Sequence, residues 1–236
     1  MTIFWSVALP IILLIVLGFI NEGTEYREQI LSAVVAMGIL FNGLYGLSFE
    51  ILLNRNNGIF KILRITPFKT SQFIFLSSLS KVIVSLLTSY VSLIFGIMIF
   101  GFDYSILKLI LLFPLLVLGI LSFCFLGFFI GNIAKVETQV SLIANILAMP
   151  MLFLSNSFYT VPESQKVLHF ITRINPFNYF IKSIQETLNG TYYILSSAYI
   201  ILGILALIGF LLAFVTFKWE SNSSNVKISK VRAGKN

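Results

Sequence analysis

The sequence has few of the residues on which most enzyme sites depend. Its 236 residues include one cysteine, Cys124, and one histidine, His169, which excludes an intrachain disulfide, a cysteine-based metal site and any two-histidine site such as HExxH. The single aspartate, Asp103, excludes a catalytic pair of aspartates. No GxxxxGK[ST] segment is present, so the chain cannot cradle ATP in a P-loop of its own. Any energy it uses must come from a gradient or from a partner.

Charged residues are also scarce, and they are unevenly placed. They make up 11% of the chain, against about 25% in a soluble domain, while 58% of the residues are apolar. Six stretches of 21 residues or more lack any Asp, Glu, Lys or Arg: Met1–Asn21, Gln29–Phe49, Val82–Phe102, Leu109–Ala134, Thr138–Pro162 and Thr187–Phe217. A bilayer-spanning helix needs about 20 apolar residues. The sequence therefore predicts an all-α, polytopic integral membrane protein with six transmembrane helices.

The uncharged stretches also predict the domain organisation. We expect the membrane helices near residues 3–20, 29–53, 74–100, 106–131, 139–156 and 195–217. Residues 1–217 then form one six-helix transmembrane domain. The last residues, 218–236, are polar, basic and rich in Ser and Asn, which predicts a disordered tail at the anionic inner leaflet.

The positive charges predict an orientation. If the first helix starts inside, the inner side of the membrane holds eleven of the sixteen Lys and Arg residues and the outer side holds five. Lys and Arg are enriched in cytoplasmic loops, so this bias favours a cytoplasmic N-terminus and a cytoplasmic C-terminus. The basic composition follows from that topology, and no nucleic-acid partner is expected.

A basic inner segment, residues 54–70, follows the second predicted helix. Asn57 can cap the start of a helix, and Pro67 disfavours helix at the residue before it, so about two turns of helix are expected between them. Apolar residues lie near one side of this helix, and two basic residues three positions apart lie on another. Such a helix can rest in the lipid headgroups, or it can serve as the docking point of a cytoplasmic motor. The pattern leaves both readings open.

The segment before the last predicted helix does not read as a hydrophilic loop. An amphipathic stretch, residues 165–174, is followed by a turn at Asn175 and Pro176. The apolar residues of the next stretch have the spacing of one helical face: Phe177, Phe180, Ile181, Ile184 and Leu188. We expect two short helices that lie on the outer leaflet or re-enter it.

In this order, the segments resemble the membrane subunits of type-2 ABC transporters, the ABC-2 permeases. After the second helix, the family's basic turn and Thr-Pro are matched by Arg55, Gly58, Lys61, Arg64, Thr66 and Pro67. Its Leu-Ser-Gly-x-Phe-x-Pro stretch is matched, after the fifth helix, by Leu154, Ser155, Asn156, Phe158 and, a little later, Pro162. Its Leu-Asn-Pro-x-x-Tyr turn is matched by Ile174, Asn175, Pro176 and Tyr179. The resemblance covers roughly residues 1–217, and it departs at Asn54 and Asn56, where the family has acids, and at Asn156, where it has glycine.

The resemblance implies the permease subunit of an ATP-driven exporter in the plasma membrane. A separate ABC ATPase subunit would bind ATP and Mg, and this chain would carry no cofactor, metal or catalytic residue of its own. A second permease subunit, identical or related, would complete the substrate path through the lipid bilayer. The substrates implied are a drug, an antimicrobial peptide or a lipid-like amphiphile.

The same resemblance assigns candidate residues. The segment at 54–70 would dock on the ATPase through Arg55, Gly58, Phe60, Lys61, Leu63, Arg64 and Pro67. Within it, Phe60 and Leu63 are expected to form the exposed apolar side that carries the contact. The outer-helix motif consists of Ser155, Asn156, Phe158, Pro162, Asn175, Pro176 and Tyr179.

Several polar or small residues of the predicted helices have two readings. Asn42, Asn145 and Asn156 are candidates for the substrate path. Asn132 could also line a path, and for all four residues the alternative is a hydrogen bond between helices. For Glu50 and Lys81, anchoring or mutual pairing is favoured over substrate contact. For the GxxxG at Gly127–Gly131, packing within the chain is favoured over dimerisation.

Two other functions compete with the exporter. A gradient-driven secondary transporter is the alternative, but such proteins usually need ionisable groups inside the membrane, and the predicted interior has almost none. An intramembrane protease is disfavoured. The segment Gly46-Leu47-Ser48 resembles a GxS motif, but the single histidine, His169, lies on the predicted outer segment, away from it.

Overall fold

The structure, a computed structural model, describes residues 2–20, 23–65, 69–155 and 172–217. Within these ranges the regular elements are all helices, and no strand occurs. The elements are α1 (Thr2–Gly18), α2 (Thr24–Phe41), the π-helix η1 (Asn42–Gly46), α3 (Leu47–Asn56), α4 (Ile59–Arg64), α5 (Thr70–Phe100), α6 (Ile106–Ile133), α7 (Glu137–Phe153), α9 (Pro176–Asn189) and α10 (Leu195–Thr216). The predicted all-α class is confirmed for this part of the chain.

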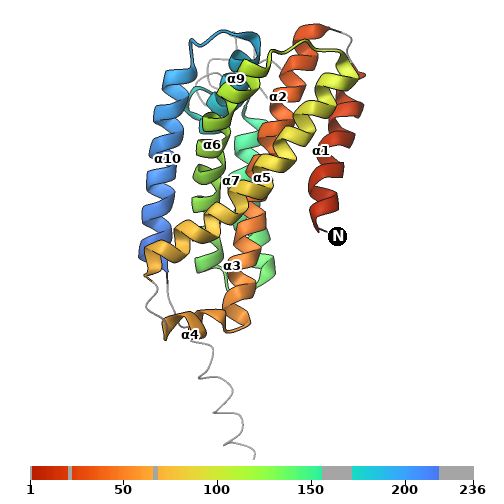
Figure 1. Cartoon of the computed structure of the whole chain (residues 1–236). Helices are drawn as coiled ribbons and strands as arrows, with labels where there is room; N and C mark the ends of the chain where they lie inside the picture. The colour runs from red at the N-terminus through yellow and green to blue at the C-terminus, as the bar shows by residue number, and fades with distance from the viewer. Residues whose placement is uncertain (1, 21–22, 66–68, 156–171, 218–236) are drawn as a thin grey trace, which may run out of the picture.

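One continuous helix runs the length of the bundle. α2, η1 and α3 follow one another without a break as the 33 residues Thr24–Asn56, and Figure 1 shows them extending from one end of the molecule toward the other. α4 lies across the lower end in that view, which we name the α4 end. α9 lies at the opposite end, which we name the α9 end. Between the two ends, α6 and α10 pack side by side.

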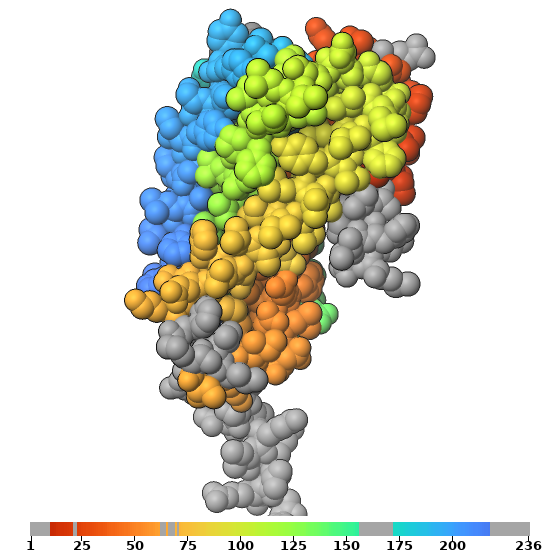
Figure 2. All heavy atoms as spheres, in the orientation of Figure 1, coloured from red at the N-terminus to blue at the C-terminus, as the bar shows by residue number. Residues whose placement is uncertain are grey.

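α5 crosses the bundle diagonally, and Figure 2 shows it in yellow on the face toward the viewer. Many of its large apolar side chains point outward and are exposed: Phe75, Leu76, Leu79, Ile83, Leu87, Phe95 and Met98. α10 likewise exposes Ile204, Leu207, Leu211 and Val215. An apolar outer surface of this kind suits contact with lipid chains.

Among the described residues, four helices are long and apolar enough to cross a membrane: Thr24–Asn56, Ser71–Phe100, Ile106–Ile133 and Leu195–Thr216. The six spans expected from the sequence would add α1 and α7, which have 17 residues each. At 1.5 Å per residue, a helix of that length is near the lower limit of about 17 residues for a span. Length and composition thus support a polytopic membrane protein with four clear spans.

Two predicted boundaries are wrong, for reasons of helix capping. The second helix begins at Thr24 and not near residue 29, so Glu25 and Glu28 lie within it. Acidic residues are favourable near a helix N-terminus, and their charge therefore does not mark a loop there. Asn57 does not cap the start of α4. It ends α3 instead, donating its backbone N–H to the Leu53 carbonyl at 2.8 Å.

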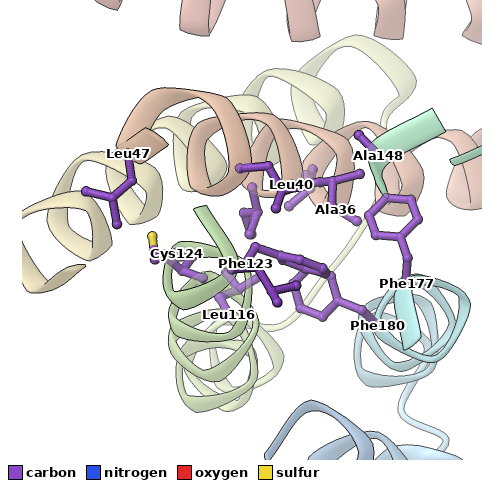
Figure 3. Close-up of a cluster of buried hydrophobic side chains, with 14 of the residues drawn as sticks. Ala36, Leu40, Leu47, Leu116, Phe123, Cys124, Ala148, Phe177 and Phe180 are labelled. Atoms are coloured by element: carbon purple, nitrogen blue, oxygen red, sulfur yellow. The ribbon is translucent and has the colours of Figure 1, made fainter. Parts of the chain in front are cut away.

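The core lies where α6 faces the long helix, α7 and α9. Figure 3 shows Phe123 of α6 beside Phe180 of α9, with Leu40 and Ala36 of α2 across from them. The ring centroids of Phe123 and Phe180 are 6.0 Å apart, and both side chains are fully buried. Cys124 is buried in the same core as a free thiol. This packing fixes α9 against α6 and α2.

Candidate functional site

α4 is set at an angle to α3 by a single glycine. Gly58 has φ +76°, a left-handed conformation that residues with a Cβ adopt only at a cost. Its carbonyl then accepts the backbone N–H of Lys61 at 3.0 Å, which starts α4. Open space surrounds the position where a Cβ would be added. Gly58 is thus required by the turn and not by packing.

Phe60 points into the bundle and not toward a partner. Its side chain is 1% exposed, and its ring centroid lies 5.3 Å from the rings of Phe73 in α5 and of Phe217, which directly follows α10. Phe128 of α6 lies 5.9 Å from both of those rings. We name these four residues the Phe60 cluster. The expectation that Phe60 forms the exposed apolar side of the docking helix is wrong, because a helix of six residues has too few turns for its pattern to reveal which side faces the bundle.

The outer side of α4 is formed by other residues. Lys61 is exposed, Ile59 is 38% exposed, and Ile65, which follows the helix, is 86% exposed. The backbone of Leu63 and Arg64 belongs to α4, but their side chains lie outside the described part, as does Pro67.

Arg55 is directed at the end of α6. Its Nη1 donates to the Asn132 carbonyl at 2.7 Å, and its Nη2 donates to the Ala134 carbonyl. The last carbonyls of a helix lack partners within the helix and carry the negative end of its dipole, so a guanidinium is favourable there. The Arg55 guanidinium is partly removed from water and bonded to both carbonyls, so it holds the end of α3 to the end of α6. In the described structure it is not a free surface charge.

Two further polar contacts join helices near the α4 end. Lys81 of α5 and Glu50 of α3 form an ion pair with a 2.6 Å separation between Nζ and Oε2, so the predicted mutual pairing is confirmed. The Asn132 amide donates to the Ala213 carbonyl at 3.0 Å and to Thr216 Oγ1 at 3.3 Å, both in α10. Asn132 therefore acts as a contact between helices.

The middle of the bundle contains a close backbone contact at η1. A Cβ added to Gly127 would lie 2.0 Å from the Gly43 carbonyl oxygen, so α6 and η1 touch through their backbones. Ser48 Oγ donates to the Gly127 carbonyl at 2.7 Å beside this contact. A Cβ on Gly131 would likewise meet Ile51 and the Ser48 carbonyl at 2.8 Å each. The GxxxG thus packs within the chain, as predicted.

Two of the three candidate path residues lie on this π-helix and on the neighbouring helix α7. Asn42 begins η1 and is half-buried, while Asn145 is exposed on α7. Tyr45 Oη donates to Asn145 Oδ1 at 2.6 Å. The sequence analysis missed Tyr45, although its position three residues after Asn42 in a helix was a usable signal. Asn156, the third candidate, lies outside the described residues.

The outer-helix motif is built around Asn175. Its Oδ1 accepts the Phe177 backbone N–H at 3.1 Å and caps α9, while its Nδ2 donates to the carbonyls of Met151 at 2.7 Å and Leu154 at 3.0 Å. Pro176 takes the first position of the helix, where a missing N–H costs nothing. One asparagine thus fixes α9 to the end of α7.

The remaining motif residues behave differently. Ser155 is buried and donates to the Leu152 carbonyl at 2.7 Å, whereas Tyr179 is half-buried. Asn156, Phe158 and Pro162 lie outside the described residues, as does most of the first predicted short helix. The second is confirmed as α9, whose predicted apolar face is at most 1% exposed: Phe177, Phe180, Ile181, Ile184 and Leu188.

A polar groove of about 390 Å³ opens between α2 and α9 at the α9 end. It is lined by Glu25, Glu28, Gln29, Ile181, Lys182, Gln185 and Asn189. The Asn189 amide donates to Glu28 Oε2 at 2.9 Å and joins the two walls. Burial, followed by the nearby Glu28 carboxylate, raises the pKa of Tyr104, so that phenol stays protonated beside the groove.

No group of three His, Cys, Asp or Glu side chains placed to hold a metal ion occurs in the described ranges. What the structure offers is a short helix held across one end, a polar region at mid-bundle and a helix fixed over the other end. Together with the apolar outer surfaces of α5 and α10, this arrangement is that of a membrane protein.

Comparison with known proteins agrees with that conclusion. A family model described as ABC-2 type transporter matches residues 1–189, from α1 to the end of α9. No curated protein matches the chain significantly. The match spans most of the chain and contains the turn at Gly58, the Phe60 ring and the Asn175 cap. The chain therefore belongs to the ABC-2 type transporter family, as a transmembrane permease component that is not itself catalytic.

Proposed function

We propose that this permease is a subunit of an ATP-driven exporter in the plasma membrane and that a separate ABC ATPase subunit docks on α4. The observation that carries the proposal is the geometry of α4, a short helix fixed across one end of the bundle with its outer side exposed. Family membership supports it. The lack of a P-loop in this sequence also supports the proposal, because a separate ATPase subunit would bind the ATP and Mg that drive the cycle.

The described part of the docking surface consists of Ile59, Lys61 and Ile65, and Leu63, Arg64 and Pro67 are assigned to it by the family resemblance alone. Buried apolar side chains supply most of the energy of an interface, whereas charges at its rim mainly steer the encounter. Ile65 is the large apolar side chain most open to a partner here, at 86% exposed. We therefore assign the main apolar contact to Ile65 and a steering role to Lys61.

The α4 end is the cytoplasmic end in this proposal. Residues 1–217 then form one permease domain of six spans, with α1 and α7 as the two shorter ones and both termini inside, and residues 218–236 form a cytoplasmic tail. The excess of Lys and Arg on that side supports the assignment. Lys61→Cys in a Cys124→Ser background should react with a membrane-permeant maleimide in intact cells and not with an impermeant one. Thr191→Cys, at the α9 end, should react with both, and the reverse pattern would overturn the orientation.

The substrate path runs along the side of the long helix that carries Asn42 and Tyr45, opposite Asn145 of α7. Three polar side chains in an otherwise apolar region suit an amphiphile, whose polar group they can bind while its apolar part contacts helix surfaces. Drugs, antimicrobial peptides and lipid-like molecules have that character. A second permease subunit, identical or related, closes the path, and the family resemblance alone assigns Asn156 to it.

Co-purification with the ATPase tests the docking assignment. We expect Ile65→Ala to weaken ATPase binding about tenfold and Lys61→Ala to change it by less than about fivefold, since an exposed ion pair contributes little. Ile106→Ala is the matched control, because Ile106 is also highly exposed but begins α6 at the other end of the bundle. An Ile65→Ala variant that binds like the Ile106→Ala variant would assign α4 to the headgroup layer. Transport by the permease alone, driven by an ion gradient, would establish the secondary transporter instead.

A further inference from the structure

α4 is attached to more of the bundle than its position in the chain requires. By sequence it is connected to α3 and α5 only. Through Phe60 it also contacts Phe217, which directly follows α10, and Phe128 of α6 lies against both Phe73 and Phe217. Displacing α4 therefore displaces a ring that contacts the end of α10 directly and reaches Phe128 of α6 through Phe73 and Phe217.

The two helices reached in this way are joined to each other along the bundle. Ser122 Oγ of α6 donates to the Leu202 carbonyl of α10 at 2.8 Å. A Cβ added to Gly209 of α10 would lie 3.1 Å from Phe125 Cβ, so the helices are in close contact there. The Asn132 amide adds a third contact near the α4 end. α6 and α10 should therefore move as a unit when their ends are displaced.

We propose that Phe60 is a positioning residue that transmits displacement of α4 to the α6–α10 pair. This inference rests on the proposed function, in which the ATPase binds the outer side of α4. A close-packed interior does not absorb displacement gradually but shifts between discrete packings, so a buried ring can relay a push that an exposed side chain cannot. Phe60 is buried, whereas Ile59, Lys61 and Ile65 are exposed, so binding of the ATPase and its coupling to transport depend on different residues in and beside one short helix.

The experiment uses the assembled transporter and measures three quantities: ATPase co-purification, ATP hydrolysis, and substrate transported per ATP hydrolysed. For Phe60→Ala we expect the ATPase to co-purify and to hydrolyse ATP within about twofold of the parent. Transport per ATP should fall about tenfold, within the range typical of coupling between sites. Phe60→Leu fills most of the space and should recover part of the lost ratio. Phe217→Leu changes the ring on the other side of the contact and should lower the ratio in the same way.

The matched control is Phe125→Ala. Phe125 is also buried, and its ring lies 5.3 Å from that of Phe210 in α10. Alanine removes this ring contact without touching α4, but it keeps the Phe125 Cβ beside Gly209 and leaves the Ser122 and Asn132 contacts that join α6 to α10. We expect this variant to lose thermal stability but to keep its transport per ATP. Equal ratios in the Phe60→Ala and Phe125→Ala variants would overturn the positioning role. If Phe60→Ala fails to fold, an unchanged ratio in both Phe60→Leu and Phe217→Leu would overturn it as well. Failure of the parent permease to co-purify with any ATPase would instead contradict the proposed function.

Discussion

The α4 end and the α9 end each hold a short helix against the long ones, but they do so with very different numbers of buried contacts. α9 has 14 residues, buries a stripe of five large apolar side chains and is tied to α7 by the amide of Asn175. α4 has six residues, and its anchors in the described structure are the ring of Phe60 and, just before the helix, the guanidinium of Arg55. Free energy of local opening falls as buried contacts become fewer. The α4 end is therefore where a partner can move a helix, and the α9 end is a fixed cover.

The largest loss of stability should come from shortening a side chain in the buried apolar face of α9. Phe180 is fully buried against Phe123, and a Cβ on Gly119 would lie 2.4 Å from its ring. We expect Phe180→Ala to lower the free energy of unfolding by about 3–5 kcal/mol, as for other buried aromatic residues. Phe214→Ala on the exposed side of α10 should cost less than about 1 kcal/mol. Thermal unfolding in lipid nanodiscs measures both, and similar losses would contradict the view of α9 as a fixed cover.

Removing the cap of α9 should have a smaller effect. Asn175→Ala deletes the acceptor for the Phe177 N–H and both donors to the end of α7. We expect a loss of about 2 kcal/mol, because a cap and buried hydrogen bonds are lost together. Asn189→Ala, which breaks one exposed bond to Glu28 at the other end of the same helix, should change stability by no more than about 0.5 kcal/mol. If the two variants unfold at the same temperature, Asn175 does not hold α9 to α7.

The α9 end could be predicted from the sequence because its signals are local and periodic. Five apolar residues at helical spacing and the Asn175-Pro176 start specified both the helix and its buried face. Pairing of Glu50 with Lys81 was predictable for a similar reason, since two opposite charges at the same depth of a membrane have few other partners.

The α4 end could not be predicted in this way. Six residues give less than two turns, so the pattern could not show that Phe60 faces inward while Ile65 faces outward. The reason lies in Phe217, a ring 157 positions later in the chain that no local pattern connects to Phe60. The bond between Tyr45 and Asn145, 100 residues apart, was hidden in the same way. Contacts of this kind follow only from the three-dimensional packing of the helices.

At the α4 end, the second anchor can be tested without touching the aromatic rings. Arg55→Met removes both donors to the end of α6 while keeping an apolar stem of similar length. We expect a loss of about 1–2 kcal/mol, because buried carbonyls lose charged donors. Arg55→Lys should restore only part of the lost stability, since an ammonium cannot reproduce the planar contact of a guanidinium with both carbonyls. Lys135→Met, an exposed cation beside the same turn, should stay within about 0.5 kcal/mol of the parent. An unaffected Arg55→Met variant would leave Phe60 as the sole anchor.

The smallest effect on stability gives the closest comparison of the two ends. Gly58 follows α3 with φ +76°, and Gly190 follows α9 with φ +81°. Neither has a neighbour that would clash with an added Cβ, because Gly58 has none within 4 Å and the nearest atom to Gly190 is Lys108 Cε at 3.4 Å. Alanine should therefore cost about 1 kcal/mol at either site, through backbone strain alone. Gly203→Ala, within α10 and with open space around it, should be neutral or slightly stabilising.

The two strained variants should nevertheless differ in transport. The turn at Gly58 sets the angle of α4, so Gly58→Ala shifts the docking surface and should lower transport per ATP hydrolysed about fivefold, at the weak end of what coupling between sites supplies. The turn at Gly190 follows a helix whose buried face already fixes its position, so Gly190→Ala should leave that ratio unchanged at the same loss of stability. Measuring both quantities on both variants separates strain from position. Equal losses of transport would mean that α9 moves during the cycle as freely as α4, and the α9 end would then be a second moving element.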